Sequence, residues 1–251
     1  MENSLLLHGR KAIITGASSG IGRAIAEQLA AQGASVALLA RREERLRETA
    51  EKIEGNGGTA AVFPIDLRDF STIPNCISKA SDKLDGLDIL INAAGVARQA
   101  SLVDGDFDDW QTMMDVNVLA LTAVTKEALR YFPSEGGHIV NISSMSGHRV
   151  PGKGGFYAPS KFAVRAITEG LRQELRQADN LTRVSSISPG FVDTELLDEY
   201  FATGAGGSKY DKIGYPILQP QEIADLVLHQ LTMPKTAEVT DILVRPTGQK
   251  T

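Results

Sequence analysis

Tyr157 and Lys161 are the residues of this sequence whose types and spacing are best suited to acid–base chemistry. They lie four residues apart in the stretch FYAPSKFAV, 156–164. Residues at i and i+4 share a helix face, so a phenol and an ammonium can reach the same point. Pro159 between them is tolerated in the first turn of a helix, where its missing N–H would have no partner. The stretch therefore predicts a helix that begins near Tyr157, although the same spacing also occurs on solvated helix faces.

The elements that must position this pair alternate between strand and helix. Short apolar runs with little internal alternation predict strands covered on both faces, and amphipathic runs predict helices. The predicted strands are 11–15, 35–40, 59–65, 87–93, 137–143, 183–188 and 241–246, and the predicted helices are 20–32, 43–54, 71–84, 107–132, 157–178 and 221–232. This order indicates a single doubly wound α/β domain of Rossmann type over residues 1–251, with a seven-stranded parallel sheet flanked by helices. The glycine-rich stretch 202–209 is the best candidate for a mobile loop.

Composition narrows the class of protein. The net charge of -5 and the pI near 5.5 argue against a nucleic-acid surface, which needs clustered basic residues. Cys76 is the only cysteine, so no internal disulfide can form. No apolar run approaches the roughly 20 residues of a membrane span, and three consecutive leucines near the start are too few for a signal-peptide core. We expect a cytoplasmic protein that does not insert into a membrane.

A glycine-rich turn follows the first predicted strand in TGASSGIG, 15–22. Glycines there allow a tight turn and let backbone amides approach a pyrophosphate at the positive end of the next helix. A glycine turn between strand and helix is also common without a ligand, but its place at the first β–α turn favours dinucleotide binding. The residues expected to bind the cofactor here are Gly16, Ser18, Ser19, Gly20, Ile21 and Gly22.

The end of the second predicted strand indicates which dinucleotide is bound. A carboxylate about 20 residues past the glycines binds the ribose hydroxyls of NAD, whereas arginine suits the phosphate of NADP. The chain reads LLARR, with Ala40 in the acidic position and Arg41 and Arg42 directly after it. NADP is therefore favoured over NAD, although both arginines could instead begin a solvated helix face.

Further candidate residues lie where other predicted strands end. Asp66 and Leu67 follow the third strand, and the acid could accept a hydrogen bond from an adenine amino group. The fourth strand ends in NAAG, Asn92, Ala93, Ala94 and Gly95, whose small residues would let the backbone run under a ribose. Open α/β sheets bind ligands at these carboxyl ends, although each segment could equally be a strand cap.

The ensemble of motifs resembles the short-chain dehydrogenase/reductase family over nearly the whole chain. The motifs are the glycine turn, NAAG, Asn117, the ISS triplet ending at Ser144, the Tyr157/Lys161 pair and SPGFVDT, 188–194. The resemblance implies a catalytic tetrad of Asn117, Ser144, Tyr157 and Lys161. It also implies that Pro189, Gly190, Val192 and Thr194 hold the nicotinamide. Ala93 and Pro159 depart from the usual pattern, and neither is expected to disrupt it.

This resemblance implies NADP(H)-dependent interconversion of a carbonyl and an alcohol. The alkoxide that forms needs a proton and hydrogen bonds. Tyr157 would supply the proton, and Lys161 together with the charge of the oxidised nicotinamide would lower the phenol's pKa from about 10. Ser144 would hold the substrate oxygen, and Asn117 would help to hold a water that links the lysine to solvent.

Segments 141–150, 167–176 and 241–249 resemble the subgroup of dehydrogenase/reductase family member 11 and insect farnesol dehydrogenases. That subgroup implies ketosteroids, diketones or other apolar carbonyls as substrates. Serine 3-dehydrogenase-like enzymes are a related group and imply small 3-hydroxy acids. The substrate-facing loop is expected at about 193–218. An apolar pocket could be lined by Phe156, Phe191, Tyr200, Phe201 and Tyr210, although all five could be ordinary packing residues.

Other classes fit less well. A hydrolase based on Ser144, Ser146 and His148 lacks a GxSxG elbow. The dispersed histidines and the absence of HExxH argue against a metal site. A dinucleotide-binding sensor or scaffold would keep the glycine turn but would not need Ser144, Tyr157 and Lys161. The resemblance also implies a homodimer or homotetramer formed through the long helices 107–132 and 157–178.

Overall fold

The protein is built on a parallel β-sheet. The computed structural model describes residues 5–152, 154–202 and 209–250. Within these residues the sheet has seven parallel strands in the order β3-β2-β1-β4-β5-β6-β7. The strands are β1 (Lys11–Thr15), β2 (Ser35–Ala40), β3 (Thr59–Pro64), β4 (Ile89–Asn92), β5 (His138–Ile142), β6 (Arg183–Pro189) and β7 (Asp241–Val244). The fold class predicted from the sequence is confirmed.

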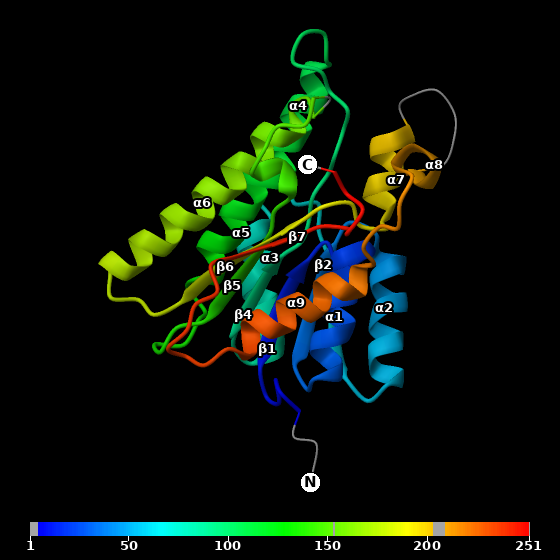
Figure 1. Ribbon diagram of the computed structural model, residues 1–251. Helices are drawn as coiled ribbons and strands as arrows, with labels where there is room; N and C mark the ends of the chain where they lie inside the picture. Colours follow the sequence, from blue (N-terminus) through cyan, green and yellow to red (C-terminus); the bar gives the residue numbers. More distant parts are fainter. Residues whose placement is uncertain (1–4, 153, 203–208, 251) are drawn as a thin grey trace.

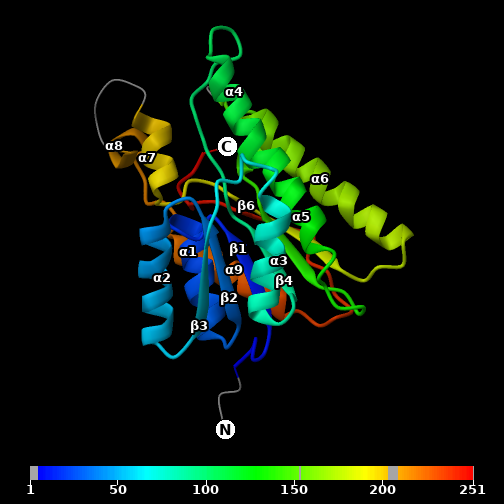
Figure 2. The ribbon, with the colours of Figure 1, turned by 180° about the vertical axis from the view of Figure 1, so that it is seen from behind.

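Helices cover both faces of the sheet (Figures 1 and 2). One layer holds α1 (Gly20–Ala31), α2 (Glu43–Gly55) and α9 (Pro220–Thr232), and the other holds α3 (Ile73–Leu84), α5 (Leu121–Ala128) and α6 (Tyr157–Gln177). Two further helices, α7 (Glu195–Ala202) and α8 (Lys209–Ile213), lie side by side beyond the carboxyl ends of the strands. None of the helices in the described ranges is long and apolar enough to cross a membrane.

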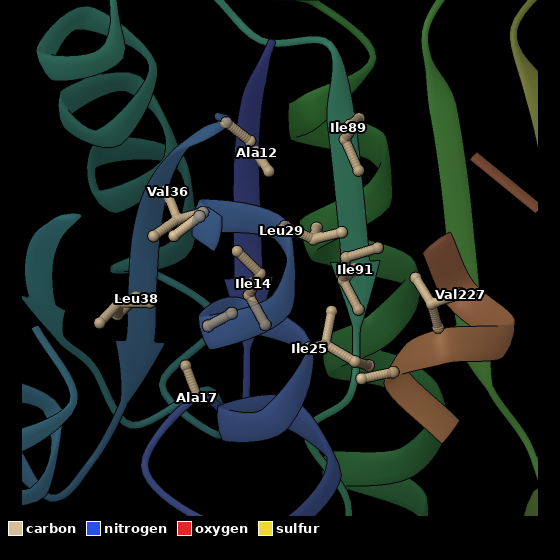
Figure 3. Close-up of a cluster of buried hydrophobic side chains, with 14 of the residues drawn as sticks. Ala12, Ile14, Ala17, Ile25, Leu29, Val36, Leu38, Ile89, Ile91 and Val227 are labelled. Carbon is tan, nitrogen blue, oxygen red and sulfur yellow. The ribbon is translucent and has the colours of Figure 1, made fainter. Parts of the chain in front are cut away.

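Successive side chains of each central strand enter opposite layers of the core. In β1, Ile14 packs with the layer of α1, α2 and α9, while its neighbour Ile13 packs with the layer of α3 and α5. In β4, Ile91 and Leu90 divide in the same way. Figure 3 shows the first layer, where side chains of β1, β2 and β4 meet those of α1 and α9. Burial on both faces explains why these strands read as continuous apolar runs.

One long helix differs from the sequence prediction. The helix expected over 107–132 is α4 (Phe107–Met114), a π-helical segment η1 (Asp115–Ala120) and α5, which ends at Ala128. Beyond Ala128 the backbone closes in tighter turns, such as Tyr131 N to Ala128 O at 3.0 Å, because Pro133 disfavours a helical conformation just before it. Helix α6 begins at Tyr157 with Pro159 in its first turn, as predicted.

The segment expected as a substrate-facing loop, about 193–218, contains helices α7 and α8, which the sequence prediction missed. Both are short, with eight and five residues, so their apolar periodicity is too brief to be recognised. The stretch 202–209, predicted to be mobile, lies outside the described residues except at its two ends.

The order of the strands positions the candidate site. The chain runs from β1 outward through β2 to β3, then returns to β4 on the other side of β1. The loops that follow β1 and β4 therefore diverge to opposite sides and leave a crevice at the carboxyl ends of the strands. The predicted glycine turn and NAAG segment both lie at this crevice, because they follow these two strands.

Candidate active site

A cavity of about 350 Å³ opens at this crevice. Its walls come from the loops after β1, β4, β5 and β6, from the start of α6, and from α7. Most of the site residues predicted from the sequence line it: Gly16, Ser19, Gly20, Ile21, Gly22, Ala93, Ala94, Gly95, Ser144, Tyr157, Lys161, Pro189, Gly190, Val192 and Thr194. Segments that lie far apart in the sequence, from Gly16 to Thr194 among these residues, thus share one cavity.

The hydroxyl groups of Tyr157 and Ser144 share a hydrogen bond within this cavity. Ser144 lies in an extended conformation after β5, and its Oγ also accepts from Ser146 N at 3.1 Å. Ser143 is 3% exposed, and its Oγ donates to the backbone oxygen of Lys161 at 3.5 Å. Of the two serines, Ser144 is therefore the one placed to act with the phenol.

Burial controls the charge of Tyr157. It raises the pKa of Tyr157 to about 12, the hydrogen bond with Ser144 opposes this rise, and the nearby Tyr200 adds to it. Lys161 Nζ lies 5.8 Å from the Tyr157 ring centroid and donates to Ile142 O at 3.0 Å, and it is not among the causes of the raised pKa of Tyr157. The lowering of the phenol's pKa by Lys161 together with the oxidised nicotinamide stays a prediction. With its pKa raised to about 12, the phenol of Tyr157 is neutral near pH 7.

Lys161 is held in a dry environment beside Asn117. The lysine side chain is 5% exposed, and burial lowers its pKa to about 8. A Cβ added to Gly95 would lie 3.8 Å from Lys161 Nζ and 3.3 Å from Asn117 Oδ1, so only a glycine leaves this corner open. Such a lysine is poised to release its proton near neutral pH.

Asn117 is positioned by the π-helical segment η1. Its Oδ1 accepts from Val96 N at 2.8 Å, and its Nδ2 donates to Val96 O at 2.9 Å. The same Nδ2 donates to Ser160 Oγ at 3.1 Å, which ties the loop after β4 to helix α6. Single-turn π-helical segments are frequent at functional sites, where they re-aim a side chain. Asn117 does not line the cavity itself, so its role in holding a water stays a prediction.

The glycine turn fits a pyrophosphate. Gly16 has φ +70°, and a Cβ there would lie 2.8 Å from the backbone of Ala93. A Cβ on Gly22 would overlap the Gly16 carbonyl group, so the turn can close only with glycine at both positions. Thr15 Oγ1 accepts from Ala93 N and from Ala94 N at 3.1 Å each, which joins the ends of β1 and β4. The amides at the start of α1 consequently face the cavity, where an anion is favoured.

A cluster of basic and hydroxyl side chains lies next to this turn. Arg42 NH2 donates to Ser18 Oγ at 3.2 Å and to Ser19 Oγ at 2.7 Å. Arg42 NH1 pairs with Glu195 Oε2 at 2.7 Å, and Arg45 NH1 pairs with Glu195 Oε1 at 3.1 Å. Arg42 thus contacts the glycine turn while its side chain stays 46% exposed. Arg45, at 44% exposed, belongs to the same cluster.

Six predicted cofactor residues do not line the cavity: Ser18, Arg41, Arg42, Asp66, Leu67 and Asn92. Arg41 is exposed at the end of β2, and its charge contributes to the lowered pKa of Asp66. The main cause of that lowering is Arg68, whose NH2 lies 2.9 Å from Asp66 Oδ2. Leu67 is buried in the core layer of α3 and α5. Any contact of Asp66 with an adenine stays a prediction.

Asn92 also points away from the cavity. Its Nδ2 donates to Thr125 Oγ1 and to Asn141 Oδ1, both at 2.9 Å. Asn141 in turn donates to Thr168 Oγ1 on α6 at 2.9 Å. This buried polar network fixes β4 and β5 against the helix that carries Tyr157. A contact of Asn92 with the cofactor stays a prediction.

The walls of the cavity include residues that the sequence did not single out. They are Ala97, Ile142, Met145, Arg149, Pro151, Leu196, Leu197, Tyr215, Gln249 and Lys250. The C-terminal segment reaches the cavity because β7 pairs with β6, and Phe191 N donates to Gln249 Oε1 at 3.4 Å. No local sequence pattern predicts such a contact. Only the pairing of the last strand brings these residues to the site.

The five aromatic residues considered for an apolar pocket divide into two groups. Phe191 and Tyr200 line the cavity. Phe156 instead stacks on Trp110 with ring centroids 5.5 Å apart, and Phe201 packs behind the wall against Phe191 and Tyr200. Tyr210 is exposed, and its hydroxyl donates to Asp193 Oδ2 at 2.7 Å.

Comparison with known proteins identifies the family. The family model described as short chain dehydrogenase matches residues 10–204, well over half of the 251 residues. The chain belongs to the short chain dehydrogenase family. The matched region of this short-chain dehydrogenase includes the glycine turn, the NAAG segment and all four residues of the predicted tetrad.

The similarity to individual relatives extends over nearly the whole chain. Dehydrogenase/reductase SDR family member 11 of Mus musculus is 39% identical over 251 residues, 96% of each chain. A short chain dehydrogenase of Burkholderia cenocepacia, solved in complex with NADP, is 33% identical with a TM-score of 0.83 and covers 95% of this chain and 97% of its own. The closed form of a serine dehydrogenase, complexed with NADP+, is 27% identical with a TM-score of 0.86 and a coverage of 96% of each chain. The chain is thus an oxidoreductase of this family, similar to proteins that bind NADP.

Proposed function

We propose that the protein is an NADP(H)-dependent oxidoreductase that interconverts a carbonyl and a secondary alcohol, with Tyr157 as the general acid and base. The observation that carries this proposal is the meeting of Tyr157, Ser144 and Lys161 in one cavity beside the glycine turn. A sensor of dinucleotides would need the turn but has no use for this cluster. The alternative of a non-catalytic scaffold is therefore disfavoured.

The residues of the cluster have separate tasks. A bound reduced nicotinamide supplies the hydride for the carbonyl carbon. Ser144 donates a hydrogen bond to the carbonyl oxygen, and Tyr157 gives that oxygen its phenolic proton as charge develops. The buried Lys161 ammonium stabilises the phenolate left behind and can pass on its own proton, because its pKa is lowered to about 8. In the alcohol-oxidising direction the same proton transfers run backwards.

The cluster of Arg42, Ser18 and Ser19 supports NADP(H) as the cofactor. A guanidinium with two neighbouring hydroxyls matches the oxygens of a phosphate monoester, and Ala40 leaves no acid to bind a free ribose 2′-hydroxyl. The 2′-phosphate would lie over these side chains. The pyrophosphate would lie on the amides of the glycine turn.

The cavity walls support two classes of substrate. Phe191, Leu197 and Tyr200 favour an apolar ketone or aldehyde, such as a steroid, a diketone or an isoprenoid carbonyl. Arg149 and Lys250 also line the cavity, and the buried Nε of Arg149 has no hydrogen-bond partner in the described part of the chain. A guanidinium of this kind could hold a carboxylate. A 3-hydroxy-acid or serine dehydrogenase is therefore the second candidate.

The test is the oxidation of NADPH and NADH by the purified protein, followed by the absorbance of the reduced nicotinamide. The carbonyl panel contains ketosteroids, vicinal diketones, aromatic aldehydes and 3-oxo acids. We expect turnover with NADPH well above that with NADH, and the best carbonyl identifies the substrate class. Absence of turnover with every pair of cofactor and carbonyl contradicts the proposal.

We also propose that the chain forms one domain and assembles into a homodimer or homotetramer through the helices α4, α5 and α6. Leu119 on η1 and Phe162 on α6 support this surface, because both are large apolar side chains at least 40% exposed. Light scattering of the purified protein tests the assembly. A mass equal to that of one chain contradicts it.

A further inference from the structure

Glu195, the first residue of α7, places its carboxylate at the cluster proposed for the cofactor phosphate. One oxygen pairs with Arg42 NH1 at 2.7 Å and the other pairs with Arg45 NH1 at 3.1 Å. Arg42 is the first cause of the lowered pKa of Glu195, and a hydrogen bond from Ser19 adds to it. The Glu195 carboxylate thus pairs with two arginines and accepts a hydrogen bond from a serine of the glycine turn.

The donors around Glu195 are those that suit a phosphate monoester. Guanidinium groups bind phosphate and carboxylate oxygens in the same planar manner, so either anion can occupy the site. Both anions cannot face the same guanidinium edge without repulsion, because two negative charges in contact disfavour each other. A 2′-phosphate that binds Arg42 and Ser19 must therefore displace the carboxylate.

The position of Glu195 connects this site to the substrate side of the cavity. Two residues further along α7, Leu197 is buried and lines the cavity. One helical turn later, Tyr200 also lines it, and its ring centroid lies 6.3 Å from that of Tyr157. The short helix α7 therefore connects Glu195 with the cavity wall formed by Leu197 and Tyr200, beside Tyr157.

We propose that Glu195 competes with the 2′-phosphate of NADP(H) for Arg42 and Arg45, and so limits the preference for NADP(H) over NAD(H). This inference rests on the proposed NADP(H) function and adds Glu195 and Arg45 to the residues that decide cofactor choice. Because coupling between two bound states is reciprocal, binding of the phosphate also releases α7 from the arginines. NAD(H) carries no 2′-phosphate and leaves the pairing of Glu195 intact.

The expected effect of Glu195 on NADP+ affinity follows from the exposure of its two ion pairs. The side chains of Arg42, Arg45 and Glu195 are 46%, 44% and 42% exposed, so each pair contributes only as much as a partly solvated pair does. Such a pair changes an equilibrium by at most about fivefold. Loss of both pairs is therefore expected to tighten NADP+ binding by about three- to twentyfold. The affinity for NAD+ should stay within about twofold, since no anion competes there.

The experiment measures the binding of NADP+ and NAD+ by calorimetry to the wild type, Glu195→Gln, Glu195→Ala and Glu199→Gln. Glu199 is an exposed carboxylate of the same helix, so the last variant controls for the change in net charge. Adenosine 2′,5′-bisphosphate and adenosine 5′-monophosphate are titrated as well, because they differ only in the phosphate concerned. Thermal unfolding of each variant verifies that it is folded.

Tighter binding of NADP+ and of the bisphosphate by both Glu195 variants, with NAD+ and the Glu199 control unchanged, supports the inference. Unchanged or weaker NADP+ binding by both variants overturns the inference about Glu195. If the wild type then still prefers NADP+, the proposed function is not affected by this result. If neither dinucleotide binds to the wild type, the proposed function fails and the inference fails with it.

A second comparison tests Arg45. In the Glu195→Gln background, Arg45→Gln should weaken NADP+ binding by about fivefold and leave NAD+ unchanged. Arg47→Gln is the matched control, because Arg47 lies on the same helix and pairs with Glu43 instead. Equal effects of the two arginine substitutions would exclude Arg45 from the phosphate site.

Discussion

Replacing Lys161 by methionine should stabilise the folded protein near pH 7, although the same change removes a residue proposed to act in proton transfer. Lys161 is 5% exposed and donates one hydrogen bond, to Ile142 O. Burial lowers its pKa from 10.5 to about 8. The charged ammonium is therefore less stable in the folded state than in the unfolded chain, by about 3 kcal/mol. Methionine has a similar length and no charge to bury.

The net gain is smaller than this figure. The substitution leaves the backbone oxygen of Ile142 without its partner, which costs about 1–2 kcal/mol. We expect Lys161→Met to raise the free energy of unfolding by about 1–2 kcal/mol at neutral pH. The gain in stability should be largest at low pH. Below about pH 8 the Lys161 amine is protonated in both the folded and the unfolded state, and the folded protein carries the full cost of burying the charge.

Between about pH 8 and 10.5 the unfolded chain keeps the proton that the folded protein has lost. The free energy of unfolding of the wild type therefore rises with pH in this window relative to that of the variant. The assay is urea denaturation at about pH 7 and about pH 10, with Lys126→Met as the control because Lys126 is exposed on α5. A variant that is less stable than the wild type by the same amount at both pH values would refute the reasoning.

Four further substitutions probe other parts of the structure. His138 is 1% exposed and burial lowers its pKa to about 3, so its stabilising contribution is complete above pH 6.5 and is lost as the pH falls toward 3. His138→Gln should flatten the loss of stability on acidification, measured as urea midpoints across this range; an unchanged acid limb contradicts the assignment. Gly22→Ala should weaken NADPH binding at least about tenfold in a fluorescence titration, because its Cβ overlaps the Gly16 carbonyl group. Gly170→Ala on α6 meets no atom within 4 Å and should instead be neutral or stabilise by about 0.5–1 kcal/mol. Arg149→Gln should lower kcat/KM for 3-oxo acids by more than about tenfold and spare uncharged ketones, since one lost charge-assisted hydrogen bond costs about 1.5–3 kcal/mol; equal losses on both substrate classes would exclude a carboxylate site.

The parts of the site that the sequence predicted are those encoded by local spacing. Tyr157 and Lys161 share one face of one helix, so a four-residue interval was enough to place them together. The glycine turn was recognisable because Gly16 and Gly22 occupy positions where a side chain would overlap the backbone. The ends of the strands were also predictable locally, because each continuous apolar run stops where its strand ends.

The remaining features depend on contacts between distant segments. Glu195 reaches Arg42 across 153 residues, and Gln249 reaches the segment after β6 only because β7 pairs with that strand. The hydrogen bonds of the Asn92 side chain to Thr125 and Asn141 inside the core could not be predicted from its place in NAAG. The burial that raises the pKa of Tyr157 could not be predicted from the sequence of one helix, because it depends on segments from other parts of the chain.

The most direct test of the account is the reduction of the best carbonyl substrate by Tyr157→Phe, measured together with NADPH binding. The substitution removes only the proposed proton donor, so kcat should fall by about 10²- to 10⁴-fold while the affinity for NADPH stays within about twofold. Tyr131→Phe serves as the control, because Tyr131 packs against the core layer of α3 and α5 and does not line the cavity. Turnover by Tyr157→Phe at the rate of the wild type would contradict the assignment of Tyr157 as the general acid and base.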